Sequence, residues 1–335
     1  MKALFPVLVG ALVALVVGDV LILGVGQSPA EVYRLLLEGT WGNPYGFAQV
    51  LYKATTLTFT GLAVALALRA GLFNIGAEAQ LALGGFAASV MGLVLPGSVP
   101  APFAIIACVL AAALGGAAGG AVPGALNAWF GANEVITTIL LNFVVLFFLN
   151  WVVTAHLHVP ETVHTPALTN GIVPRLSVLI PAFRGSAANA TVLLAIAAAV
   201  VTGWFVFRTR FGYELRAVGL SPDAAEAAGI VLPRVRVATF ALAGALAGMG
   251  GTNFVLGYKH YYEDGFTGGA GLIGIAVALA GRAHPIGIML AALAFATLSQ
   301  GGLAIHALVP KQMADILQGV VILAIAIASA SRARS

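Results

Sequence analysis

Three polar side chains in one short stretch are the first candidates for chemistry in this chain. Asn74, Glu78 and Gln80 lie at or just inside the edge of a long apolar run. Asn74 and Glu78 are four residues apart and would share one helical face, whereas Gln80 would point elsewhere. An ionisable side chain within a membrane tends to face a cavity or a partner. The stretch therefore either lines a passage for a solute or caps a helix and bonds to neighbouring helices.

A second polar set recurs along a later apolar run. Glu134, Thr138 and Asn142 are spaced every four residues, and Asn253 is an amide in another run. Hydrogen bonding between packed helices explains this spacing slightly better than a pathway does. Because the apolar runs contain almost no charge, a pathway through them would suit a neutral, hydrogen-bonding solute. The candidate pathway residues are Asn74, Glu78, Thr138, Asn142 and Asn253.

The sequence contains no recognisable catalytic or nucleotide-binding motif. It has neither a P-loop nor the G-x-S-x-G pattern of a nucleophilic serine. His156, His158 and His164 are close in sequence, but they lack the spacing of a zinc site such as HExxH. We expect no enzyme activity, metal or cofactor in this chain, so uphill transport would need energy from a partner.

The composition indicates an all-α polytopic membrane protein. The 335 residues are 60% hydrophobic and 8% charged, whereas about a quarter of the residues of a soluble globular protein are charged. A membrane-spanning helix needs about 20 apolar residues. We predict one transmembrane domain over residues 1–335, with about ten spans at roughly 3–25, 54–69, 72–95, 103–122, 135–155, 190–207, 237–257, 268–281, 285–304 and 312–331.

The distribution of basic residues predicts the orientation. With the N-terminus inside, ten of the sixteen Lys and Arg residues lie on the cytoplasmic side. Both termini and the loop 208–236 would then be cytoplasmic, and the loop 156–189 would be external. The net charge of +4 reflects this topology, and no basic cluster indicates nucleic-acid binding.

The loop 208–236 carries eight of the 28 charged residues and has the signals of a short helix. Ser221 is a suitable N-cap and Pro222 a suitable first residue. Asp223 and Glu226 lie toward the positive N-terminal end, and Gly229 would follow the last turn. A capped, polar helix in so apolar a chain indicates contact with a soluble partner.

The two halves of the chain share weak matches. Thr58-Phe59 matches Thr239-Phe240, and residues 73–77 can be aligned with 266–270. These matches suggest two units, 54–155 and 237–331, inverted relative to each other by the span count, although chance could produce them in Gly/Ala-rich sequence. Inverted repeats with Gly-interrupted helices are typical of transporters. Glycine ladders at Gly116/Gly120/Gly124 and Gly244/Gly248 would allow close helix packing.

Four separated motifs carry a resemblance to a known family. They are GLFNIGAEAQ at 71–80, NEVITT at 133–138, RAVGLSPDAAEAAGI at 216–230 and GFTGGAGLIGIAVALAGRAHPIG at 265–287. In this order they resemble the ABC-importer permeases of the nucleoside or simple-sugar type, within the branched-chain amino acid and ribose permease group. The resemblance covers about residues 50–330, and the first motif looks most like the nucleoside branch.

The resemblance implies a cell-membrane import complex. Its other parts would be a second permease subunit, identical or homologous, ATPase subunits that bind ATP and Mg²⁺, and an external solute-binding lipoprotein. The helix in 208–236 would be the coupling helix that docks on the ATPase. Glu226-Ala227-Ala228 is followed at once by Gly229, which departs from the EAA signature of other ABC importers. The candidate coupling residues are Arg216, Ser221, Pro222, Asp223, Glu226 and Gly229.

We therefore expect a permease subunit that passes a nucleoside inward, with a simple sugar or another small polar solute as the alternative. A protein of another class, an ion-coupled secondary transporter, would need a titratable residue deep in a span. Glu78, Glu134 and Asp315 are the candidates, and all lie near predicted span ends. The external loops 27–53, 156–189 and 257–267 would face the binding protein or be ordinary solvated turns.

Overall fold

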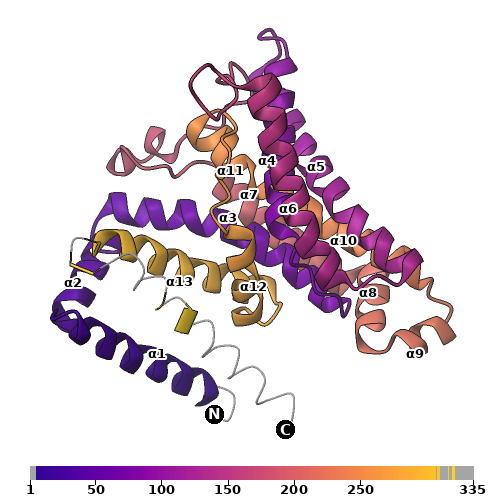
Figure 1. The fold of residues 1–335 in the computed structure, drawn as a ribbon, viewed down its shortest axis with the longest axis horizontal. Helices are drawn as coiled ribbons and strands as arrows, with labels where there is room; N and C mark the ends of the chain where they lie inside the picture. The colour runs from indigo at the N-terminus through magenta and orange to yellow at the C-terminus, as the bar shows by residue number, and fades with distance from the viewer. Residues whose placement is uncertain (1–4, 307, 310–315, 317–318, 321–335) are drawn as a thin grey trace.

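The computed structural model describes residues 5–306, 308–309, 316 and 319–320, and this part of the chain is built from helices (Figure 1). They are α1 Phe5–Gly24, α2 Pro29–Thr40, α3 Pro44–Arg69, α4 Ala77–Val94, α5 Ala101–Phe130, α6 Glu134–Val152, α7 Thr191–Arg208, α8 Arg210–Leu220, α9 Pro222–Ala227, α10 Leu232–Gly250, α11 Thr252–Phe254, α12 Ala270–Ala280 and α13 Pro285–Ala304. Short π-helical segments, Val153–Leu157 and Val255–Lys259, extend α6 and α11.

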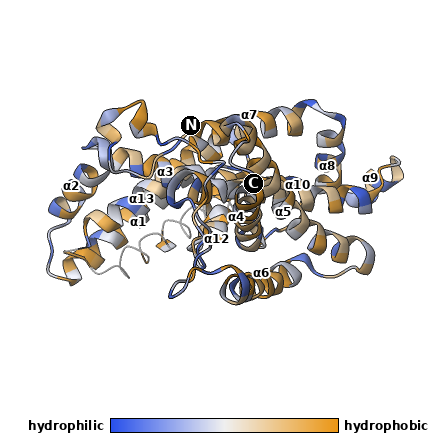
Figure 2. Ribbon diagram, turned by 90° about the horizontal axis from the view of Figure 1, so that it is seen from above, coloured by the Kyte–Doolittle hydropathy of each residue, from blue (hydrophilic) through white to orange (hydrophobic). Residues whose placement is uncertain are grey.

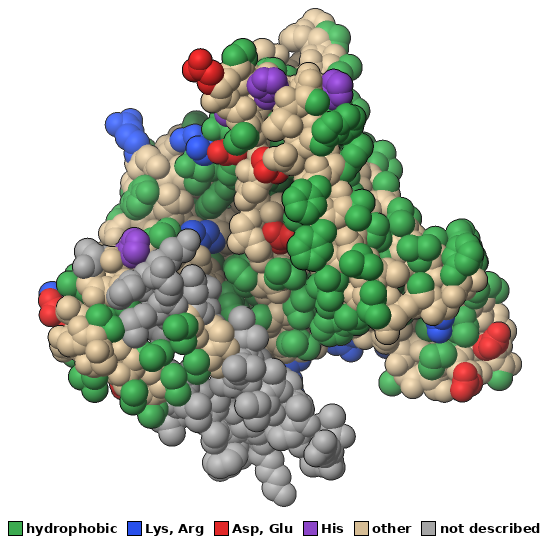
Figure 3. Space-filling model, viewed as in Figure 1, with side chains coloured by type: hydrophobic (Ala, Val, Ile, Leu, Met, Phe, Trp, Pro, Cys, Tyr) green, Lys and Arg blue, Asp and Glu red, His purple; other side chains and the backbone are tan. Residues whose placement is uncertain are grey.

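The helices confirm a polytopic membrane protein. The described residues contain seven helices long and apolar enough to cross a membrane, or eight if α1 and α2, bent by 110°, form one broken span. The predicted count of ten is not confirmed. The span predicted at 312–331 lies almost wholly outside the described residues. Large apolar side chains cover much of the face in Figure 3, and charged side chains gather toward its edges, as expected for a surface in contact with lipid.

Two predictions about the elements were wrong. The segment 27–53 is not a loop, because it contains α2 and the first turns of α3. Each helix begins with a proline at its first position, and Asn43 caps α3 by accepting a hydrogen bond from the Gly46 amide at 2.6 Å. The span predicted at 268–281 is α12, with 11 residues. At 1.5 Å per residue it is about 16 Å long, roughly half of the hydrocarbon core.

The two aligned motifs lie at equivalent places in the fold. Residues 73–77 and 266–270 end at the first residues of α4 and α12, respectively. Helix α3 packs against α12 and α13, and α10 packs correspondingly against α4 and α5. In Figure 1, α4 lies above the centre of the molecule and α12 below it. These corresponding contacts are those expected if α3–α5 and α10–α13 are related units.

Glycines allow a very close contact between α5 and α10. A Cβ at Gly244 would overlap the carbonyl oxygen of Gly116, and a Cβ at Gly120 would overlap that of Phe240. Only glycine allows two backbones to approach this closely. The predicted role of the glycine ladders in close packing is therefore confirmed.

Candidate translocation and coupling sites

The carboxylate of Glu78 lies between the N-terminal ends of two helices. Glu78 is in the first turn of α4, and its side chain is buried. Its two oxygens accept hydrogen bonds from the backbone amides of Gly269, at 2.9 Å, and Gly271, at 2.6 Å. These amides belong to the start of α12, where helical backbone donors have no partner within the helix. Glu78 therefore caps a helix almost 200 residues away in sequence.

Asn142 of α6 forms hydrogen bonds to the backbone at the start of α4. Its side-chain oxygen accepts from the Ala79 amide at 3.1 Å, and its nitrogen donates to the Ile75 carbonyl at 3.0 Å. Thr138, one turn earlier on α6, is fully buried and donates its hydroxyl to the Glu134 carbonyl at 2.6 Å. The polar face of α6 thus lies against the non-helical segment 70–76 between α3 and α4, called the break below.

Asn74 lies within that break and pairs with Gln80. The two amide side chains exchange hydrogen bonds at 2.9 and 3.2 Å, and the Asn74 oxygen also accepts from the Gly76 amide. The structure therefore brings together Asn74, Glu78, Thr138 and Asn142. Sequence reasoning placed Gln80 on a different helical face from Asn74, which is correct for a regular helix, but the break folds Asn74 back toward it.

Asn253 belongs to a different network. Its nitrogen donates to the Tyr52 carbonyl at 2.8 Å and the Thr56 hydroxyl at 2.9 Å. Its oxygen accepts from Asn189 at 3.0 Å and Thr191 at 2.8 Å. The network joins α3, α7 and α11. Sequence reasoning missed Asn189 and Thr191 because they lie at the end of a long loop without helical spacing.

All five candidate pathway residues are buried, and their polar groups bond to protein. Such bonds hold helices in place, and each would have to break before its group could contact a solute. The structure thus gives these residues a packing role that the sequence left as one of two alternatives. Whether they also contact solute remains a prediction.

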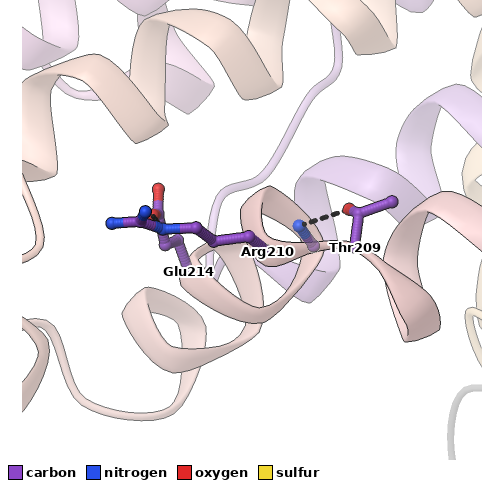
Figure 4. Close-up of polar contacts among 4 residues, drawn as sticks. Thr209, Arg210 and Glu214 are labelled. Atoms are coloured by element: carbon purple, nitrogen blue, oxygen red, sulfur yellow. Dashed lines mark hydrogen bonds and ion pairs between the residues drawn. The ribbon is translucent and has the colours of Figure 1, made fainter.

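Helices α8 and α9 form an arm at one end of the molecule, beyond the end of α10 (Figure 2). The Thr209 hydroxyl caps α8 by accepting from the Gly212 amide at 3.0 Å, and Arg210 pairs with Glu214 at 3.2 Å (Figure 4). Ser221 caps α9 through the Ala224 amide, with Pro222 as its first residue. The predicted capping is confirmed.

The end of α9 also follows the prediction. Gly229 has a φ of +85°, and the Ile230 amide bonds to the Ala225 carbonyl at 3.0 Å, as in a Schellman C-cap. Asp223 and Glu226 are exposed, and only Ala225 of this helix is buried. Leu220, at the tip of α8, is 88% exposed. The arm thus presents a capped helix beside an uncovered apolar side chain.

The C-terminal end of α8 rests on the break between α3 and α4, residues 70–76. A Cβ at Gly219 would overlap the Arg69 carbonyl oxygen, so the backbones are in contact. The guanidinium carbons of Arg69 and Arg216 lie 5.4 and 5.7 Å from the centre of the Phe207 ring, within the range of a cation–π interaction. Sequence reasoning treated Arg69 only as a topology signal, because its partners are far away along the chain.

The loop 156–189 lies along the segment that follows α11. Thr165 and Leu168 donate backbone hydrogen bonds to the carbonyls of Tyr262 and His260, at 2.9 and 2.7 Å. Burial lowers the pKa of His260. The hydrogen bond to the Leu256 carbonyl opposes this effect in part, and the charge of Arg175 adds a smaller lowering of the pKa. Two of the loops predicted to be external therefore form one layer.

No group of three potential metal ligands occurs within the residues that were described.

Comparison with known proteins gives a consistent result. A family described as the permease component of branched-chain amino acid transport systems matches residues 46–326. The chain is 34% identical to a glucose ABC transporter permease, TsgB13, of Haloferax volcanii, over 95% of this chain and 85% of that protein. It is 33% identical to the guanosine ABC transporter permease NupP of Bacillus subtilis, over 97% and 93% of the two chains.

A third relative is the nucleoside ABC transporter permease NupB of Lactococcus lactis, 32% identical over 90% of this chain and 84% of that protein. No solved structure matches significantly. The family match covers most of the chain, and the helical architecture is that of a multi-pass membrane protein. The chain therefore belongs to the family of branched-chain amino acid transport system permease components, among the permeases of ABC transporters.

Proposed function

We propose that this protein is the permease subunit of an ATP-driven importer that passes nucleosides into the cell. Two relatives that match most of the chain are permeases for nucleosides or guanosine. The helices near the α3–α4 break contribute amides and hydroxyls and a single buried carboxylate. A neutral, hydrogen-bonding solute could exchange bonds with these amides and hydroxyls without bringing a charge into the membrane.

The exposed, capped arm of α8 and α9 is the observation that supports coupling to an ATPase. In an importer the ATPase subunits would bind ATP and Mg²⁺, and their movement must reach the membrane helices through a rigid contact. Helix α9 is exposed on all residues but one, whereas the C-terminal end of α8 touches the α3–α4 break. The proposed coupling residues are Arg216 on α8 and, in and around α9, Ser221, Pro222, Asp223, Glu226 and Gly229.

The remaining parts of the assembly follow from this role. A second permease subunit, identical or homologous, would complete the passage, and membrane lipids would surround the apolar outer surface. An external lipoprotein would deliver solute to the layer formed by 156–189 and 257–267. The excess of basic residues near the arm supports a cytoplasmic arm and cytoplasmic termini in the inner membrane.

Replacement of the helix tests the coupling role directly. The permease, with Ser221–Gly229 exchanged for a Gly/Ser linker, is expressed with its ATPase and purified. We expect the ATPase to be lost from the complex and ATP-dependent uptake to disappear. Arg34→Ser with Glu38→Ser, which removes an exposed ion pair on α2, is the control and should change neither. Intact ATPase binding and uptake after the linker exchange would refute the proposal.

A simple sugar is the second candidate solute, because the glucose permease of Haloferax volcanii is equally similar to this chain. Calorimetry of the cognate binding protein with guanosine, uridine and glucose separates the two candidates. Uptake of the same labelled compounds by proteoliposomes provides the second measurement. Binding and uptake of nucleosides alone are expected, and uptake of glucose alone would replace the nucleoside proposal with the sugar proposal.

A further inference from the structure

Helix α12 is short and lies between two tight turns. Gly268 and Gly269 precede it with positive φ angles, and Arg282 and Ala283 follow it with φ of 56° and 49°. Positive φ is uncommon for residues other than glycine, so the second turn is held in a specific shape. The side chains of α12 are all apolar. Any polar attachment of this helix to the rest of the protein must therefore use its backbone.

Both ends of α12 are attached to residues that flank the break between α3 and α4. The Glu78 carboxylate, just after the break, accepts from the Gly269 and Gly271 amides at the N-terminus of α12. Arg69, the last residue of α3, donates from Nε to the Ala283 carbonyl, just past the C-terminus, at 3.1 Å. A negative charge thus faces the positive end of the helix dipole, and a positive charge faces the negative end.

Between these two attachments, glycines let α12 pack closely against α3 and α4. Gly271 leaves no space for a Cβ against the backbone of Glu78, and Gly274 packs against the Thr60 side chain of α3. The Thr60 hydroxyl donates to the Ala270 carbonyl at 3.0 Å. Helix α12 therefore packs through glycines against α3 and α4. It can move as a unit only if Arg69, Glu78 and the Thr60 hydroxyl move or release it.

Arg69 is also the residue on which the arm rests. Gly219, near the end of α8, contacts the Arg69 carbonyl, and a Cβ placed on it would lie 2.9 Å from the Gly71 amide nitrogen. The guanidinium groups of Arg69 and Arg216 share the Phe207 ring. A displacement of the arm consequently acts on Arg69 through both its backbone and its side chain.

We infer that α12 is the helix that the cytoplasmic arm displaces during transport, with Arg69 transmitting the movement and Glu78 positioning the opposite end. This inference rests on the proposed function, because it requires an ATPase that moves the arm. It assigns Glu78 to the holding of α12 and not to contact with solute. Arg69 and Glu78 are thus positioning residues that act on one helix from opposite sides of the same break.

The test measures coupling in proteoliposomes that contain the permease with its ATPase. Glu78→Gln removes the charge and nearly keeps the size, whereas Arg69→Gln removes both the charge and the guanidinium group that lies over Phe207. The amide introduced by Glu78→Gln can accept from only one of the two backbone donors, because its nitrogen is itself a donor. We expect assembly and ATP hydrolysis to persist, while solute transported per ATP falls about tenfold or more, as for the loss of a charge-assisted hydrogen bond. Glu38→Gln on α2, where the side chain is 57% exposed, is the control.

Glu78→Asp retains the charge on a side chain shorter by one methylene and should restore part of the coupling. A purely structural role predicts a different result, namely equal losses of ATP hydrolysis and uptake, and that result would overturn the inference. So would an unchanged ratio of transport to hydrolysis in both glutamine variants. If the unmodified complex neither binds an ATPase nor transports solute, the proposed function fails instead.

A second measurement follows the distance between α12 and α4 in the unmodified complex, and it remains informative if a glutamine variant folds poorly. Spin labels are placed by Leu272→Cys on α12, where the side chain is 50% exposed, and Val94→Cys on α4, where it is 74% exposed, with Cys108→Ala removing the native thiol. The label distance should differ between the nucleotide-free complex and the complex trapped with nucleotide and vanadate. Arg69→Gln should abolish that difference. A constant distance in the unmodified complex would refute movement of α12.

Discussion

Substitution of Asn142 by leucine tests whether the polar face of α6 holds α4 in place. The side chain is buried and makes two hydrogen bonds to the start of α4. Leucine has a similar volume, so little cavity forms, but the Ala79 amide and the Ile75 carbonyl lose their side-chain partner. A buried polar group without a partner costs about 1–3 kcal/mol. The two groups together predict a destabilisation of about 2–6 kcal/mol.

The assay is thermal unfolding of the detergent-solubilised protein, followed by size-exclusion chromatography of the remaining folded fraction. A shift of about 2–4 °C per kcal/mol for medium-sized domains translates the loss into a decrease of about 4–24 °C in melting temperature. Thr137→Val, on the same helix, is the control because its hydroxyl bonds only to the backbone of α6. A melting temperature within the error of this control would refute the reasoning, since Asn142 would then not support α4.

Two further predictions concern helix packing and pH. Gly244→Ala should destabilise the protein by about 1–3 kcal/mol in the same assay, because its Cβ would force α5 and α10 apart. Gly97→Ala is the control, because the space around Gly97 is open. Equal melting temperatures of the two variants would contradict the packing argument. The lowered pKa of His260 means that the folded state favours the neutral ring, so stability is fully present above the ordinary histidine pKa of about 6.5 and decreases as the pH falls through it. His260→Asn, which tolerates the positive φ at this position, should reduce the loss of melting temperature between about pH 8 and pH 5, and an unchanged loss would contradict this assignment.

Local sequence signals predicted the arm well. Ser221, Pro222 and Gly229 define α9 through interactions that span no more than five residues. Such capping depends on backbone groups at fixed short distances along the chain, which can be recognised without knowing the fold. The spans of α7 and α13 were also predicted to within about a residue, because a long apolar run has only one stable arrangement in a bilayer.

The same rules failed for α2 and the first turns of α3. Prolines and polar residues in 27–53 resembled a loop, although Pro29 and Pro44 are the first residues of helices. The formation of α2 depends on packing, because α2 lies against α13, which comes from the other end of the chain. Local propensity cannot detect a partner more than 200 residues away, and tertiary contact outweighs it here.

By itself the sequence determined that this is a multi-pass helical membrane protein with a polar, capped arm, because hydropathy and capping are local properties. The tertiary structure alone decided the use of its few polar side chains. The spacing of Asn74 and Glu78 left a pathway lining and a capping role as alternatives. In the structure Glu78 caps α12, Asn74 pairs with Gln80, and Asn253 links α11 to α3 and α7. A buried polar group must find a partner wherever the fold places one, and that partner cannot be read from neighbours in sequence.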